Sequence, residues 1–133
     1  EDLTRLAYAA SDFVLMPSAF EPCGLPQMIA PLYGSVPVVR NTGGLHDTIR
    51  PLNAAAGAGN GIVFETYDPQ GLLWAIDQAM IFHSLPGNVK SVQISRIMNE
   101  AKKSFNHSVT AQSYIKLYEK MMDRKLVPDF RQA

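Results

Sequence analysis

The chain has 133 residues, of which 47% are hydrophobic, so it can bury a core as one globular domain or as part of one. Its 12 Lys and Arg residues balance its 12 Asp and Glu residues, and the basic side chains near the C-terminal end are spread along predicted helices as on a solvated surface, which argues against nucleic acid as a partner. No apolar run approaches the roughly 18 residues that a membrane span requires, which argues against a membrane partner.

Helices and strands are expected to alternate along the first half of the chain, which is typical of an α/β layer fold. Spaced apolar residues over 3–10 predict a short helix. The continuous apolar run over 13–16 predicts a parallel strand covered on both faces. Residues 24–33 are expected to form a helix that kinks at Pro31, because proline lacks an N–H group and crowds the carbonyl four residues earlier.

The next elements follow the same alternation. Residues 36–40 predict a second strand. Gly43-Gly44 then turns the chain into a short helix over 45–49. Residues 51–60 contain mostly Ala, Gly and Asn, and we expect a flexible loop there. Residues 61–65 predict a third strand.

Three longer helices are expected after the third strand. The first begins with Asp68 as N-cap and Pro69 in the first helical position. We expect its apolar stripe to comprise Leu72, Leu73, Ile76, Ala79, Met80 and His83. The two C-terminal helices lie within about 89–123 and are expected over 89–103 and 108–123. The last one places four apolar residues on one face, Ala111, Ile115, Tyr118 and Met122.

Together these elements predict a partial Rossmann-like parallel sheet of about three strands with flanking helices. No internal repeat or second domain is visible, so residues 1–133 are interpreted as a single fragment of one domain. The start of the chain has neither an initiator Met nor a signal-peptide pattern, and we interpret it as a cut inside a longer protein.

The segment over residues 13–27 predicts a ligand site. It ends a buried strand, places Glu21 in a turn and then begins a helix. The first N–H groups of a helix lack intrahelical partners and carry the positive end of its dipole, so they can bind an anion or sugar hydroxyls. Gly24 would let a ligand approach the main chain, and a side chain there would project into the ligand's space. Glu21 either binds hydroxyl groups or merely complements the helix dipole.

Cys23 is the only cysteine, so an intrachain disulfide is excluded and nothing indicates an oxidising compartment. The expected location is cytoplasmic, with a plastid as the alternative if the chain comes from a plant. Cys23 has no His or Asp nearby in sequence to activate it, which argues against a thiol mechanism. The histidines lie apart at no metal-ligand spacing, and we expect neither a metal nor a cofactor.

Two motifs of this chain resemble those of the glycogen and starch synthase family. The first is Pro-Ser-Ala-Phe-Glu-Pro-Cys-Gly-Leu over residues 17–25, and the second is Thr-Gly-Gly-Leu-His-Asp-Thr over residues 42–48. They stand at the family's spacing, and the segments 61–64 and 113–118 are also similar. Members of this family are retaining glycosyltransferases of the two-domain GT-B architecture, and the chain resembles the later part of the second, donor-binding domain.

The resemblance implies an activity. The family transfers glucose from a nucleoside diphosphate glucose to the non-reducing end of an α-1,4-glucan, with retention and without an obligatory metal. ADP-glucose is expected in preference to UDP-glucose as the donor, and the glucan acceptor is expected to bind through an N-terminal domain outside this chain. The family's cationic clamp for the diphosphate also lies outside it, so the fragment alone is expected to be inactive.

The resemblance also implies roles for individual residues. Glu21 matches the carboxylate that hydrogen-bonds the donor glucose and stabilises charge at its anomeric carbon. Cys23, Gly24 and Leu25 match positions whose N–H groups face the sugar and phosphate. Thr42, Gly43 and Gly44 match a loop beside the donor, although adjacent glycines between a strand and a helix also occur simply to permit a tight turn.

Two alternatives stay open. One is a retaining GT-B glycosyltransferase with a different acceptor, and the other is a non-catalytic donor-domain module that binds or assembles with a partner. Ala19, which stands where most family members have Arg, removes a cation from the rim of the site and favours the second. The intact segment over residues 21–25 favours an enzyme.

Overall fold

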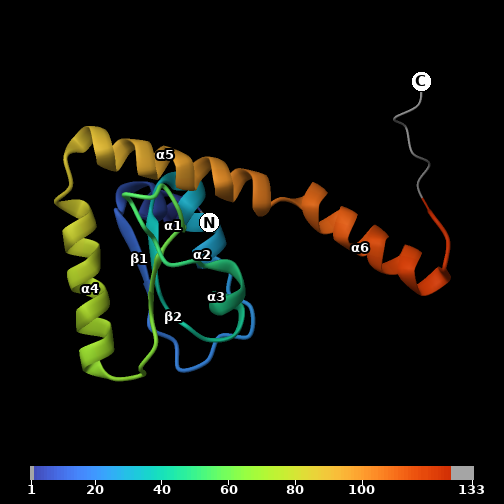
Figure 1. Cartoon of the computed structure of the whole chain (residues 1–133), viewed down its shortest axis with the longest axis horizontal. Helices are drawn as coiled ribbons and strands as arrows, with labels where there is room; N and C mark the ends of the chain where they lie inside the picture. The colour runs from blue at the N-terminus through green and yellow to red at the C-terminus, as the bar shows by residue number, and fades with distance from the viewer. Residues whose placement is uncertain (1, 127–133) are drawn as a thin grey trace. The chain divides into compact units, whose positions relative to one another are not determined.

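A three-stranded parallel sheet is the centre of the computed structural model, which describes residues 2–126 (Figure 1). Its strands are β1 (Phe13–Met16), β2 (Val36–Arg40) and β3 (Ile62–Phe64), in the order β1-β2-β3. Three of the five residues of β2 are valines, and a β-branched side chain packs well on a pleated surface buried on both sides. The predicted α/β fold with three parallel strands is confirmed.

The sheet is less evenly covered than the apolar sequence of β1 predicts. Four of the five residues of β2 are buried, whereas only Met16 is buried in β1 and Leu15 is 47% exposed. The expectation that both faces of β1 are covered is therefore wrong for the described residues. The reason is the place of β1 at the edge of the sheet, where β2 is its one neighbouring strand.

Four short elements surround the first two strands: α1 (Asp2–Ala10), α2 (Pro26–Ile29), the 3₁₀ helix η1 (Ala30–Tyr33) and α3 (Gly43–Thr48). The kink predicted at Pro31 appears as the change from α2 to η1, which ends at Gly34 with a left-handed φ of 89°. α3 begins two residues before the expected position, because the carbonyl of Thr42 accepts hydrogen bonds from the N–H groups of Leu45 and His46.

α4 (Pro69–His83) covers one face of the sheet, opposite α2 and α3 (Figure 1). Its buried residues are Ala75, Ala79 and Phe82, whereas Leu73 and Met80 are 59% and 53% exposed. The expected apolar stripe is therefore wrong at Leu73 and Met80, and also at His83, which is exposed. Small alanines allow the helix backbone to lie close to the strands, while Leu73 and Met80 lie on the outward side of the helix.

The chain divides into two compact units, Glu1–Ala101 and the part from Lys102 onward. α5 (Gly87–Ser104) belongs mainly to the first unit and packs Ile97 against Val36 and Phe82 at the amino ends of the strands. α6 (His107–Met122) belongs to the second unit and has no buried residue among those described. Both C-terminal helices exist as predicted, and Tyr118 on the expected face of α6 is 50% exposed.

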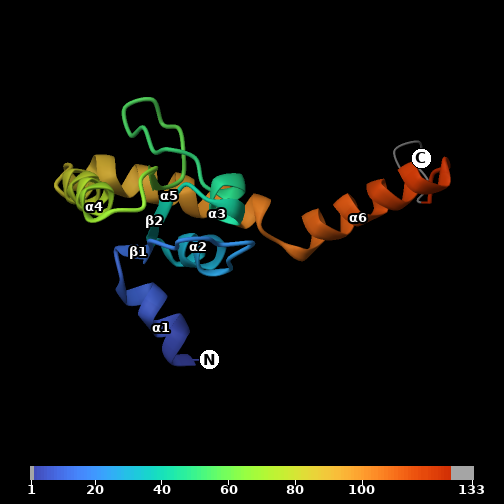
Figure 2. The same cartoon turned by 90° about the horizontal axis from the view of Figure 1, so that it is seen from below.

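The loop over residues 51–60 projects from the sheet (Figure 2). It is hydrogen-bonded within itself and to α5. Asn53 and Ala58 exchange backbone hydrogen bonds of 2.8 and 3.1 Å. Arg96 of α5 donates to the carbonyl of Gly59 at 2.6 Å, and Leu52 packs against the core. The flexibility of this loop stays a prediction.

Within residues 2–126, no helix is both long and apolar enough to cross a membrane.

The N-cap of α4 provides a test of local stability. The Asp68 carboxylate accepts a hydrogen bond from the N–H of Gly71 at 2.7 Å, as predicted for an N-cap residue. Asp68→Ala should lower the free energy of unfolding by about 1 kcal/mol, because it leaves an N–H group of the first turn without its acceptor. Asp68→Asn keeps an acceptor oxygen and should stay near the wild type. Urea unfolding of the chain measures both, and equal losses in the two variants would contradict the capping role.

Candidate functional site

All three strands end at the same edge of the sheet, and this edge carries the candidate site. The register pairs Met16 with Val39 and Arg40 with Phe64, so the segments that follow the strands start side by side. Ligands bind outside the carboxyl ends of the strands in open α/β sheets. The structure therefore brings the segments 17–25 and 42–48 to the expected place.

Backbone contact joins these two segments. The N–H of Gly44 donates to the carbonyl of Glu21 at 2.8 Å. A Cβ atom on Gly43 would lie 2.0 Å from the carbonyl oxygen of Glu21, and one on Gly44 would lie 2.1 Å from that of Cys23. Gly43 also has a left-handed φ of 48°. Neither position can carry a side chain without moving the loop that contains Glu21.

Five N–H groups beside this contact are unpaired. Within residues 2–126, those of Cys23, Gly24, Leu25, Thr42 and Gly43 donate to no protein acceptor. The N–H of Gly44 differs, because Glu21 already accepts from it. Unpaired backbone donors on two adjacent loops are suited to an anion or to sugar hydroxyls.

The Glu21 side chain is also available to a ligand. It is half-buried, and its carboxylate forms neither a hydrogen bond nor an ion pair with any described residue. The carboxylate can thus accept hydrogen bonds from hydroxyl groups, or stabilise a positive charge that develops beside it.

Gly24 has a different role from the one expected. Its φ is 74°, and a Cβ atom there would lie 2.5 Å from Oε1 of the buried Gln27. A side chain at position 24 would therefore meet Gln27 first, and the expectation that it would project into the ligand's space is wrong. A bulky substitution at Gly24 would strain the backbone as well as any ligand contact, so it cannot separate folding from binding.

Arg40, at the end of β2, is a site residue that the sequence analysis missed. Its guanidinium donates to the carbonyl of Ser18 at 3.1 Å and to that of Ala19, and it lies 5.1 Å from the centre of the Tyr67 ring. A cation is thus present beside the rim that Ala19 was expected to leave without one. The signal in the sequence was an arginine that ends an otherwise apolar strand.

A second polar group lies at the end of β2 and β3. The amide nitrogen of Asn41 donates to both carboxylate oxygens of Glu65 at 2.9 Å, and its oxygen lies 2.7 Å from Nδ1 of His46. Because the carboxylate accepts from the amide nitrogen, the amide oxygen must face the ring, and Nδ1 of His46 is the donor.

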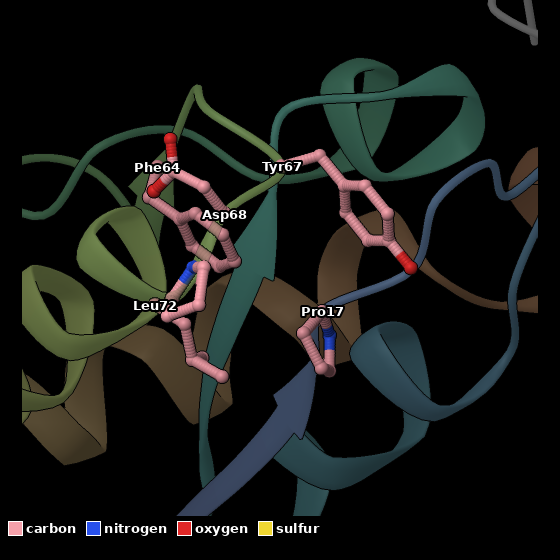
Figure 3. A pocket seen from close by; sticks show the side chains of 6 residues that line it. Pro17, Phe64, Tyr67, Asp68 and Leu72 are labelled. Atoms are coloured by element: carbon pink, nitrogen blue, oxygen red, sulfur yellow. The ribbon is translucent and has the colours of Figure 1, made fainter.

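An apolar pocket of about 400 Å³ opens at the same edge, on the side of α4 (Figure 3). It is lined by Pro17, Phe64, Tyr67, Asp68, Pro69 and Leu72. None of the site residues expected from the sequence lines it. The Asp68 carboxylate, its one acidic side chain, already caps α4.

The fold and this edge first define a class of protein. It is a parallel α/β sheet whose loops present backbone donors and the unpaired Glu21 carboxylate, as in proteins that bind phosphorylated or hydroxylated ligands. The chain matches no family model. It is 45% identical over 120 residues to the glycogen synthase of Desulforamulus reducens and 40% identical over 130 residues to that of Moorella thermoacetica. These alignments include 90% and 97% of the chain but 24% and 26% of the relatives.

A solved structure agrees with these relatives. The catalytic domain of starch synthase IV from Arabidopsis thaliana, bound to ADP and acarbose, superposes with a TM-score of 0.79 and 35% identity, over 93% of this chain and 25% of that one. The chain belongs to the glycogen and starch synthase family, and it spans about a quarter of the length of the relatives it matches.

The close approach of the two loops leads to a prediction. Gly44→Ala should destabilise the chain by at least about 2 kcal/mol, because the new Cβ meets the backbone of Cys23 and not a flexible side chain. Gly87→Ala is the matched control, since a Cβ there has no atom within 4 Å. Chemical unfolding measures both variants. Equal stability of Gly44→Ala and the wild type would show that the two loops are not in contact.

Proposed function

We propose that the complete protein carrying this chain transfers glucose, with retention, from a nucleoside diphosphate glucose to the non-reducing end of an α-1,4-glucan. The observation that carries the proposal is the pairing of a free Glu21 carboxylate with unpaired N–H groups on both neighbouring loops. The similarity to glycogen synthases supports it, and the chain would supply part of the donor site.

Each group has a place in this reaction. The N–H groups of Cys23, Gly24 and Leu25 would bind the sugar hydroxyls and the phosphate that leaves, while those of Thr42 and Gly43 would approach from the second loop. Charge develops at the anomeric carbon as the bond to the phosphate breaks, and the Glu21 carboxylate would stabilise it. Such groups stabilise the transition state effectively because the fold holds them in position before the reaction begins.

Arg40 would contribute to this site by holding the loop in place and not by contacting the ligand. Its hydrogen bonds to the carbonyls of Ser18 and Ala19 hold the segment that leads to Glu21. The additional cations that a diphosphate leaving group requires would come from outside this chain. The chain alone is therefore expected to be inactive, and the acceptor glucan would bind to another domain.

ADP-glucose is the proposed donor, and a cytoplasmic location is part of the same proposal. The structural relative with ADP bound supports the choice of an adenine nucleotide. The complete protein should elongate glycogen with labelled ADP-glucose faster than with UDP-glucose, and the isolated chain should give no product above a blank. Donor binding without transfer would favour the non-catalytic module, and transfer to another acceptor would favour a different glycosyltransferase.

Glu21 allows a direct test of the proposed chemistry. In the complete protein, Glu21→Gln should leave ADP affinity within a few fold but lower turnover by at least about 100-fold, because the charge that stabilises the transition state is lost. Asp77→Asn, on the exposed side of α4, is the control and should keep full turnover. Steady-state kinetics and calorimetric ADP titration give the two quantities. Turnover retained in Glu21→Gln would reduce Glu21 to a residue that complements the local dipole.

A further inference from the structure

We propose that Gln27 is a positioning residue that aims the N–H groups of Gly24 and Leu25 at the donor. This inference rests on the proposed function, because it concerns the same site. Gln27 is completely buried on α2, although glutamine is mostly exposed in proteins. Neither of the two sequence motifs includes it.

The side-chain amide of Gln27 spans the loop on which the donor groups lie. Its Nε2 donates to the carbonyl of Cys23 at 3.0 Å and to that of Gly24 at 3.1 Å. Both carbonyls are thereby held toward the buried side of α2. One side chain thus fixes two consecutive peptide groups.

Peptide geometry converts this contact into an orientation of the donors. In a planar trans peptide, the C=O and the N–H point in opposite directions. The carbonyl of Cys23 shares its peptide with the N–H of Gly24, and the carbonyl of Gly24 shares its peptide with the N–H of Leu25. Because Gln27 holds the two carbonyls inward, both N–H groups are directed away from it, and neither has an acceptor within residues 2–126.

Thr48 connects the same amide to the second loop. Nε2 of Gln27 also lies 3.3 Å from Oγ1 of Thr48, and that hydroxyl donates to the carbonyl of Gly44 at 2.5 Å. The amide therefore contacts the loop of Glu21 and, through one hydroxyl, the start of α3. The two loops that hold the donor groups are fixed by one set of side chains.

The other half of the Gln27 amide argues against a purely stabilising role. Oε1 is buried and has no hydrogen-bond partner, an arrangement that disfavours folding. An apolar residue of similar size would remove that unpaired oxygen. If Gln27 has a purely structural role, an apolar replacement should impair folding and function together. If Gln27 is a positioning residue, the same replacement should impair function alone.

The test uses Gln27→Met in the complete protein. We expect a Tm within a few degrees of the wild type, a Kd for ADP at least about tenfold higher and kcat/KM for ADP-glucose reduced at least tenfold. Gln93→Met is the matched control, because Gln93 is a buried glutamine on α5 that contacts Arg96. It should leave Kd and kcat/KM unchanged. Unchanged donor affinity in Gln27→Met, or a loss of affinity that follows a collapse in Tm, would overturn the proposal.

Thr48 provides a second, conservative pair. Thr48→Val removes the hydroxyl and should raise the Kd for ADP severalfold, whereas Thr48→Ser keeps the hydroxyl and should retain wild-type affinity. In the double variant with Gln27→Met the two losses should not add, because both residues act through the same contact. Full additivity, or a Ser variant as weak as the Val variant, would contradict the connection.

Failure of the proposed function would be recognised separately. A wild-type protein that neither binds ADP nor turns over ADP-glucose would show that the donor is wrong. A crystal structure of Gln27→Met would still decide the positioning role, since the peptides that join Cys23, Gly24 and Leu25 should rotate. The same peptide orientations as in the wild type would exclude it.

Discussion

The site depends on the close approach of two backbones. Gly43 and Gly44 lie so near the carbonyls of Glu21 and Cys23 that no Cβ atom fits between them. This contact sets the separation of the two loops, and with it the distance between the free carboxylate and the N–H groups opposite. Arg40 and Gln27 then fix the same loop from β2 and from α2, so its conformation is determined on several sides before any ligand arrives.

Most of the fold could be predicted because its signals are local. The apolar runs of β1 and β2, and the Asp68-Pro69 start of α4, gave these elements at or near their observed bounds. The buried face of α4 could not be predicted in the same way, because apolar residues lie around most of that helix and periodicity alone does not choose a side. The exposure of β1 depends on what lies beside it in the sheet, and its own residues do not encode that.

The candidate site was predictable to a smaller extent. The motifs located Glu21 and the glycines, but they did not show that the N–H of Gly44 is already paired or that Gly24 faces Gln27. The contacts of Arg40 and Gln27 bridge residues that only the parallel register and the packing of α2 against α3 bring together. A sequence read without that register contains both residues but gives no reason to connect them with the site.

The partly bare β1 has a practical consequence for work on this chain by itself. Its four apolar residues carry, along one edge, main-chain groups that no neighbouring strand in residues 2–126 covers, and the side chain of Leu15 is nearly half exposed. A short, uncharged strand with an open edge is a template for pairing with another chain. Preparations of the isolated polypeptide should accordingly self-associate as their concentration rises, and light scattering would need to accompany any unfolding curve measured on it.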